Sequence, residues 1–143
     1  MQTDNNEILS DEILDKGFLN TIEDALAIGS WELNMLSNTL KWSSVTKKIH
    51  DVVANYVPNV DTAINFYKKG QHREKILDLF QKALQKGENF DDEFIIITSK
   101  GEEKWVRSIG HPKFKNGVCV ALRGVFQDIT QKTLQSKKTL IKE

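Results

Sequence analysis

The sequence predicts an α+β domain built on a five-stranded antiparallel sheet, with helices inserted between the second and third strands and a flanking helix at each end. Three observations support this prediction. Short segments that alternate apolar and polar residues lie near Trp31 and again throughout the last third of the chain. Segments with apolar residues at helical spacing lie between them, and turn residues separate neighbouring strands.

The first elements are a helix and a hairpin. Apolar residues from Phe18 to Ile28 follow one face of a short amphipathic helix, which we expect Gly29 to end. Residues 30–35 alternate in the manner of a half-buried strand, and residues 39–42 form its hairpin partner.

Three helices are expected next. Ser43 or Ser44 caps the first, whose apolar side extends to Val53. Asp61 or Thr62 opens a second, which Gly70 closes. The third is the most regular, with apolar residues at helical spacing over residues 71–86 and Gly87 as its terminator.

The last third predicts three strands, at residues 90–98, 103–114 and 118–127. Pro112 marks the irregular end of the second strand. The third is apolar on both faces and is therefore expected to be central in the sheet. A helix follows Thr130.

Composition excludes several classes of protein. The chain of 143 residues has 39 % hydrophobic and 28 % charged residues and no net charge, which describes one soluble globular domain and argues against a nucleic-acid binder. Its one cysteine, Cys119, rules out an internal disulfide, and we expect it to be a small buried residue. The polar start is not a signal peptide and no stretch is apolar enough to span a membrane, so we expect a cytoplasmic location, possibly within a larger sensor.

A series of motifs resembles a known family. It resembles the PAS domains whose first strand opens with a Gly-x-Trp-Glu pattern and whose C-terminal PAC segment ends in Asp-Ile-Thr. The motifs occur in the right order over about residues 20–132, and they are Gly29-Ser30-Trp31-Glu32, Trp42-Ser43, Gly87 to Phe90 with Glu93, Lys100 to Arg107, and Gly124 to Thr130.

The resemblance implies a division of the chain and a role for it. Residues 1–17 are then a tail, residues 18–130 the PAS domain with its PAC segment at about 90–130, and residues 131–143 the start of a signalling helix. Such domains sense a small ligand or a cofactor and regulate an attached output unit, such as a histidine kinase or a diguanylate cyclase. The alternative is a ligand-free module for dimerisation or partner docking.

The end of the last strand is the expected signal relay, formed by Asp128, Ile129 and Thr130. We expect the Thr130 hydroxyl to cap the following helix, Asp128 to hold exposed N–H groups at the junction, and Ile129 to anchor it in apolar packing.

A candidate ligand pocket lies under the inserted helices. Strand alternation places apolar residues of the first and last strands on one face, and Gly124 would leave room beside them. The candidate residues are Trp31, Leu33, Met35, Phe66, Phe80, Leu122, Gly124 and Phe126. The same residues can equally fill the core and leave no pocket.

Cofactor chemistry is not specified. Covalent flavin chemistry in this family requires a helical cysteine beside the flavin ring, whereas Cys119 lies early in the last strand, and Phe126 replaces a glutamine of that branch. Haem and non-covalent flavin remain alternatives, although His50, His72 and His111 show no metal-ligand spacing and His72 is expected to be exposed.

Catalysis and charged pairs have simple interpretations. A small α+β isomerase would need an ionisable group inside its cavity, and none is predicted, so we expect no catalytic residues and no metal.

Glu93 and Arg107 are expected to pair across a hairpin, and Glu32 to lie near Arg123.

The expected partners are a second copy of the chain and an output domain. The first helix has an apolar stripe that the sheet does not fully cover, which favours a homodimer. The chain stops within a predicted helix, which suggests an output domain following it in a longer parent protein.

Overall fold

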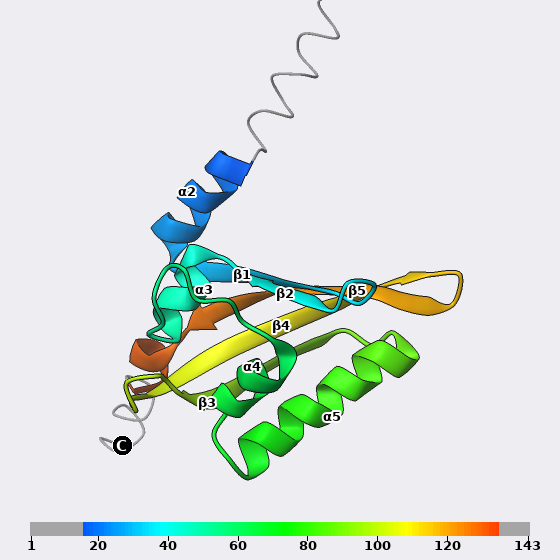
Figure 1. The fold of residues 1–143 in the computed structure, drawn as a ribbon. Helices are drawn as coiled ribbons and strands as arrows, with labels where there is room; N and C mark the ends of the chain where they lie inside the picture. Colours follow the sequence, from blue (N-terminus) through cyan, green and yellow to red (C-terminus); the bar gives the residue numbers. More distant parts are fainter. Residues whose placement is uncertain (1–15, 135–143) are drawn as a thin grey trace, which may run out of the picture.

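A computed structural model describes residues 16–134 of the chain. The tail up to residue 15 and the predicted helix beyond residue 134 lie outside the described residues. The fold is the predicted five-stranded antiparallel sheet with inserted helices, in the order β2-β1-β5-β4-β3 (Figure 1). The strands are β1 (Ile28–Asn34), β2 (Thr39–Trp42), β3 (Phe90–Ile97), β4 (Glu103–Lys115) and β5 (Val118–Asp128).

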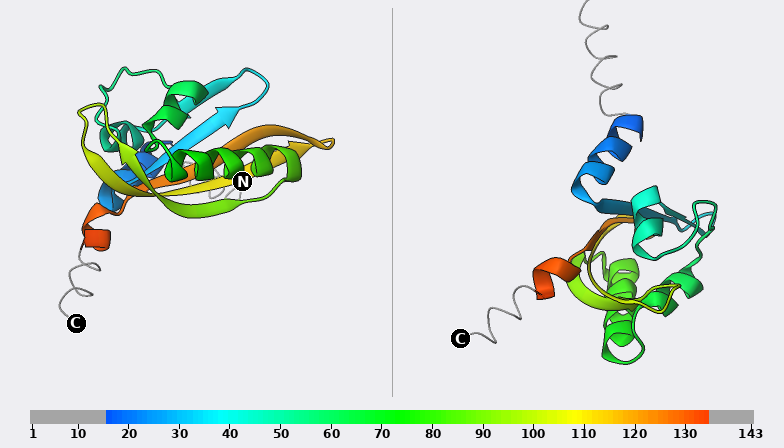
Figure 2. Two further views of the ribbon diagram at one scale, coloured as in Figure 1. Left: turned by 90° about the horizontal axis from the view of Figure 1, so that it is seen from below. Right: turned by 90° about the vertical axis from the view of Figure 1, so that its left-hand side faces the viewer.

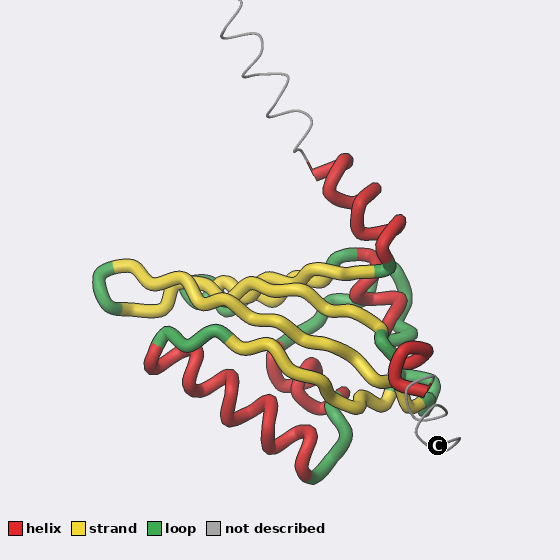
Figure 3. Tube along the Cα trace, turned by 180° about the vertical axis from the view of Figure 1, so that it is seen from behind, coloured by secondary structure: helices red, strands yellow, loops and turns green. Residues whose placement is uncertain are grey.

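The helices lie on one side of the sheet, apart from the first. Helices α3 (Ser44–Ile49), α4 (Val60–Phe66) and α5 (Gln71–Lys86) connect β2 to β3; in Figure 3, strands partly hide α3 and α4, and α5 runs alongside the edge strand β3. Helix α2 (Lys16–Leu26) projects away from the sheet, as two views show (Figures 1 and 2). The core fills the space between the sheet and α3–α5, with Phe94, Ile96, Val106 and Leu122 fully buried.

Strand β5 is central, as its two apolar faces predict. It pairs with β1 along one edge, where Trp31 lies opposite Gly124 and Leu33 opposite Leu122. It pairs with β4 along the other, and the two strands continue past the end of β3 as a hairpin. Strand β4 starts where predicted and ends one residue later than predicted, at Lys115, and its pairing with β5 shifts register beside Pro112, between Lys113 and Phe114. Proline is tolerated there because β3 stops pairing at Gly110, so the ring lies where no β3 partner needs its missing N–H.

Gly29 has a different role from the predicted one. Helix α2 ends at Leu26, Ala27 takes the positive φ of 54°, and Gly29 lies inside β1. A Cβ atom at Gly29 would lie 2.0 Å from Thr46 Oγ1 and 2.5 Å from Thr46 N. Glycine is therefore required because the first turn of α3 crosses β1 at this point.

Hydrogen bonds fasten α3 to β1 at the same point. Ser43 is the N-cap of α3, as predicted, and its hydroxyl also accepts from the N–H of Ser30 at 2.9 Å. The Thr46 hydroxyl donates to the Ser30 carbonyl at 2.9 Å. These bonds hold the start of α3 in register with β1.

The other helix ends differ from prediction in detail. Helix α3 stops at Ile49 because Asp51 has a φ of 59°, so Val53 is not on a helix and is 68 % exposed. Asn59, rather than Asp61 or Thr62, caps α4 through a reciprocal pair of bonds with Thr62. Gly70 precedes α5 instead of closing α4, which ends at Phe66. Gly87 terminates α5 in the left-handed conformation, as predicted.

Candidate functional site

A cavity of about 70 Å³ lies between the sheet and helices α3, α4 and α5. Apolar and aromatic side chains form most of its wall, and no Asp, Glu, Lys or Arg lines it. The residues around it are Trp31, Leu33, Leu40, Trp42, Thr46, His50, Val60, Ala63, Ile64, Tyr67, Ile76, Phe80, Phe90, Ser108 and Phe126. A void of this size accommodates a molecule of a few heavy atoms, well below the 300–1,000 Å³ typical of sites for drug-sized ligands.

The structure places the predicted pocket residues in several different surroundings. Trp31, Leu33, Phe80 and Phe126 line the cavity, and Leu122 is fully buried in the sheet beside them. Met35 lines a neighbouring hollow that shares Leu33, Val60 and Phe80 with the cavity, and Phe66 lines a separate surface hollow.

Gly124 does not leave the room expected of it. The Trp31 indole lies over this glycine, where an added Cβ atom would be 2.6 Å from Trp31 Cζ2 and 1.7 Å from the Ile109 carbonyl oxygen. The space that the glycine frees is therefore occupied by the ring of its cross-strand neighbour.

His50 is the central polar group that the sequence did not assign to the pocket. It is 2 % exposed, and its ring stacks on Trp42 at 4.0 Å and on Phe126 at 4.7 Å between ring centroids. The edge of Phe66 contacts it at 4.8 Å. The sequence signal that could have placed His50 in the pocket is its position four residues after Thr46, on an otherwise apolar helix face.

The His50 imidazole is neutral near pH 7. Burial lowers its pKa to about 4, and the hydrogen bond to Thr46 only partly opposes this. Nδ1 lies 2.8 Å from the Thr46 carbonyl oxygen, and because a carbonyl can only accept, Nδ1 carries the proton. Nε2 is therefore an acceptor.

Three further polar groups belong to the cavity wall. The buried Tyr67 hydroxyl donates to Ser108 Oγ at 3.2 Å, which leaves the Ser108 proton able to donate in turn. Burial raises the pKa of Tyr67 to about 12, so it too is neutral. Trp31 Nε1 is buried and has no hydrogen-bond partner among the described residues. No sequence pattern links Tyr67 to Ser108, which lie 41 residues apart.

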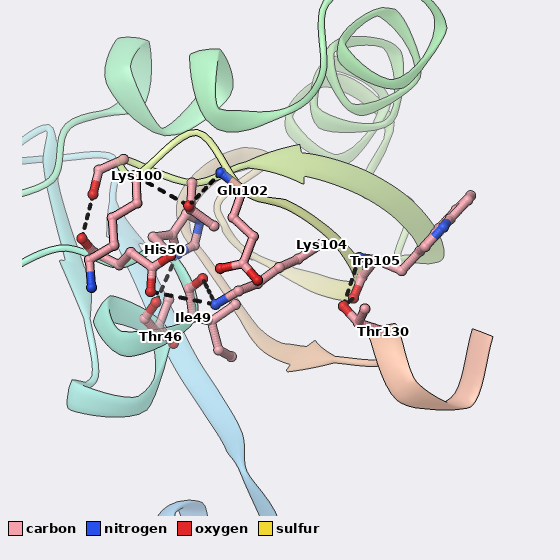
Figure 4. Close-up of polar contacts among 11 residues, drawn as sticks. Thr46, Ile49, His50, Lys100, Glu102, Lys104, Trp105 and Thr130 are labelled. Carbon is pink, nitrogen blue, oxygen red and sulfur yellow. Dashed lines mark hydrogen bonds and ion pairs between the residues drawn. The ribbon is translucent and has the colours of Figure 1, made fainter. Parts of the chain in front are cut away.

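The Asp128-Ile129-Thr130 junction adjoins the first residues of β4. Asp128 Oδ1 accepts from the N–H of Thr130 at 2.9 Å, as expected, and Ile129 is buried. The cap expected from Thr130 is wrong, because its hydroxyl accepts from the N–H of Trp105 at 3.0 Å (Figure 4). The N–H of Ile129 donates to the Trp105 carbonyl at 2.9 Å. Both peptide groups of Trp105 are thus bonded to the junction.

The charged pairs of the outer sheet also differ from prediction. Arg107 lies opposite Glu93 in register, yet its guanidinium makes a bidentate pair with Asp91 at 2.8 and 2.6 Å. The diagonal position gives the two-pronged geometry that a guanidinium favours. Glu32 lies opposite Arg123, as expected.

His72, expected to be exposed, is half-buried and its Nδ1 accepts from the N–H of Ile95 at 3.1 Å.

Neither haem nor flavin fits this cavity. A volume of about 70 Å³ is several times too small for either group. The thiol of Cys119 is buried, as expected, in the β4–β5 hairpin and is not among the cavity-lining groups. Between residues 16 and 134, no three His, Cys, Asp or Glu side chains are grouped to hold a metal ion, and no helix there is long and apolar enough to cross a membrane.

A family model described as the PAS fold matches residues 40–126, more than half of the chain. The chain belongs to the PAS family. No curated protein sequence matches it.

Many solved structures share this PAS fold, at low sequence identity. A sensory box histidine kinase/response regulator from Burkholderia thailandensis has a TM-score of 0.72 at 17 % identity, covering 87 % of this chain and 93 % of the other. The N-terminal domain of a diguanylate cyclase with a PAS/PAC sensor from Marinobacter aquaeolei has a TM-score of 0.66 at 15 % identity, with coverage of 74 % and 98 %. A domain of a putative light and redox sensing histidine kinase from Haloarcula marismortui has a TM-score of 0.63 at 24 % identity, with coverage of 80 % and 100 %.

Proposed function

We propose that this chain is a sensory PAS domain that binds a small uncharged molecule in the cavity and passes the occupancy of that cavity to an output domain through Asp128, Ile129 and Thr130. The output domain is a histidine kinase or a diguanylate cyclase, since PAS domains of proteins described in these terms share the fold. The domain does no chemistry itself. The Gly29 to Glu32 motif and the PAC segment at about 90–130 support the further proposal that it belongs to the corresponding PAS subclass.

The observation that carries the proposal is an uncharged and almost wholly apolar cavity, among whose wall residues Trp31, His50 and Ser108 carry neutral polar groups. Trp31 Nε1 is a buried donor without a partner, and such a group costs about 1–3 kcal/mol when left unsatisfied. Neutral His50 supplies an acceptor, and Ser108 a donor. A small, uncharged and mainly apolar molecule fits this wall.

The same wall argues against a charged ligand. A carboxylate or ammonium group buried here would have no opposite charge among the lining residues and would lose its hydration. The hollow lined by Met35, Asn59 and Leu84 adjoins the cavity through shared residues, and we propose it as the route of entry.

The signal would leave along β5. Phe126 stacks on His50 in the cavity wall and precedes Asp128 by two residues on the same central strand. A ligand that displaces the His50 ring therefore acts on the strand that ends at the junction.

We also propose that the domain acts as a homodimer through α2. This helix has no buried residue, and its apolar side chains Phe18, Leu19, Ile22 and Leu26 are 37–58 % exposed. A second copy supplies a matching apolar helix with no need for charge complementarity, which suits a chain of zero net charge.

A ligand-free docking module is the second candidate function, and it is favoured by the small size of the cavity.

Native mass spectrometry of the purified full chain tests the sensory proposal. We expect a reproducible extra mass, of a small organic molecule, on each wild-type chain. The Ala63→Leu variant fills the cavity from α4 and should lose that mass, whereas an exposed substitution on the same protein, Ser37→Ala, should keep it. A bare mass for wild-type protein, even after purification without dialysis, would contradict the proposal and favour the docking module.

A further inference from the structure

The end of α3 is tied to the turn between β3 and β4 by a group of polar contacts (Figure 4). The N–H of Ser99 donates to the His50 carbonyl at 3.0 Å, and the Ser99 hydroxyl donates to the Asp51 carbonyl. Thr98 holds the turn itself, since its hydroxyl accepts from the N–H groups of Lys100 and Glu102 at 3.3 and 3.2 Å. His50, whose ring lies in the cavity wall, is thus bonded through its backbone to the turn that leads into β4.

Lys104 adds a connection that is shielded from water. Its ammonium group donates to the Ile49 carbonyl at 3.0 Å and lies 3.6 Å from Asp51 Oδ1. The two side chains are 15 % and 16 % exposed, against 36–60 % for the other ion pairs of the described residues. Salt screens an ion pair this shielded from water less than an exposed pair, and separating its two charges is costly. We therefore expect the Lys104 ammonium group to stay with the end of α3 when that end moves.

The next residue on β4 is bonded to the output junction. Both peptide groups of Trp105 are engaged by Ile129 and Thr130, so that the β4–β5 ladder continues past Asp128. Two consecutive residues of β4 therefore face two separate parts of the molecule. Lys104 holds the end of α3 beside His50, and Trp105 holds the start of the helix that begins at Thr130 and is described as far as Leu134, here called the exit helix.

We propose that Lys104 is a positioning residue that couples the cavity to the exit helix by a second route, independent of β5. In this arrangement a displacement of His50 shifts the end of α3, Lys104 moves with it, and Trp105 carries the movement to Thr130. This inference rests on the proposed sensory function, because only a domain that reports on its cavity has a use for the coupling.

The test perturbs the cavity without a ligand and reads the junction by NMR. Ala63→Leu is introduced into the full chain, and amide chemical-shift changes are measured at Phe126 in the cavity wall and at Ile129, Thr130 and Thr133 in the junction. The measurement is repeated in the Lys104→Met background and in a control background, Lys113→Met. Lys113 lies on the same strand, its side chain is exposed, and its loss removes the same charge.

We expect the junction changes caused by Ala63→Leu to fall by half or more in Lys104→Met, with the change at Phe126 retained. Lys113→Met should leave both sets unchanged, and Lys104→Arg, which keeps a cation within reach of Ile49, should restore the junction response. Equal junction changes in the Lys104→Met and wild-type backgrounds would overturn the inference.

A second variant covers the case in which Lys104→Met does not fold. Thr130→Val removes the bond at the other end of the route and leaves Lys104 intact, so it should reduce the changes at Ile129 and Thr133 by a similar fraction. An undiminished response in Thr130→Val would overturn the inference as firmly. Because no ligand takes part, a failure of the sensory proposal in mass spectrometry and a failure of this coupling give separate results.

Discussion

Replacing His50 with glutamine tests whether a neutral imidazole is buried in the cavity wall. Folded His50 binds a proton only at about pH 4, because of its burial, whereas the unfolded chain binds one at the ordinary pKa of 6.5. As the pH falls through this window, the unfolded state is protonated and the folded state is not. The free energy of unfolding therefore decreases as the pH is lowered from about 6.5. Below about pH 4 the folded state is protonated as well, and His50 causes no further decrease.

The magnitude follows from the two values. The difference between 6.5 and about 4, at about 1.4 kcal/mol for each pH unit, amounts to roughly 3 kcal/mol. This is a large fraction of the 5–15 kcal/mol typical of a folded domain. The acidic groups that make ion pairs add little in the same window, because pairing keeps a carboxylate ionised to lower pH: the Arg107 guanidinium holds the pKa of Asp91 below its usual value.

The assay is urea unfolding followed by tryptophan fluorescence, at several pH values between about 7 and about 4.5. Wild-type protein should lose most of the calculated stability over this range, and His50→Gln should show a much flatter dependence whatever its stability at neutral pH. His72→Gln is the matched control. Burial also lowers the pKa of His72, but this ring is only half-buried, so that variant should keep most of the wild-type slope. A His50→Gln curve parallel to the wild type would refute the reasoning.

Four further predictions concern other parts of the molecule. Gly29→Ala should cost about 1–3 kcal/mol in urea unfolding, because its Cβ atom meets the backbone of Thr46, whereas Ser37→Ala on the exposed hairpin should change stability little. Trp31→Phe should be neutral or slightly stabilising in the same assay, since it removes a buried N–H without a partner, and a clear loss would show that the N–H is satisfied. Arg107→Met should leave the urea unfolding midpoint almost unchanged, because water screens its pair with Asp91, which is 45–48 % exposed on both sides. Ile22→Glu on α2 should convert a dimer into a monomer in size-exclusion chromatography with light scattering, and Asp24→Lys at an exposed position of the same helix should not; a wild-type monomer at high concentration would contradict the proposed dimer.

The sequence was most informative where local chemistry decides the structure. The strands, the Ser43 cap and the Gly87 terminator are all set by residues close in the chain, and each is found where the pattern predicts it. The central place of β5 followed from its two apolar faces.

The predictions that are wrong depend on contacts between distant segments. Gly29 looked like a helix terminator because its crossing with Thr46, seventeen residues later, leaves no trace in the local pattern. Thr130 looked like a cap because its partner, the N–H of Trp105, lies on another strand. His50 could not be assigned to the cavity, since its place there depends on how α3 crosses the sheet and brings its ring between Trp42 and Phe126.

Xenon titration followed by amide NMR tests the central claim most directly. Xenon enters small apolar cavities and has no other chemistry, so it reports whether this cavity accepts a guest and whether the junction responds. We predict that the amides of Phe126, Ile129 and Thr130 shift along one binding curve in wild-type protein, and that Ala63→Leu removes all three responses. Shifts at Phe126 with no movement at Ile129 and Thr130 would contradict the claim that the junction reads the state of the cavity.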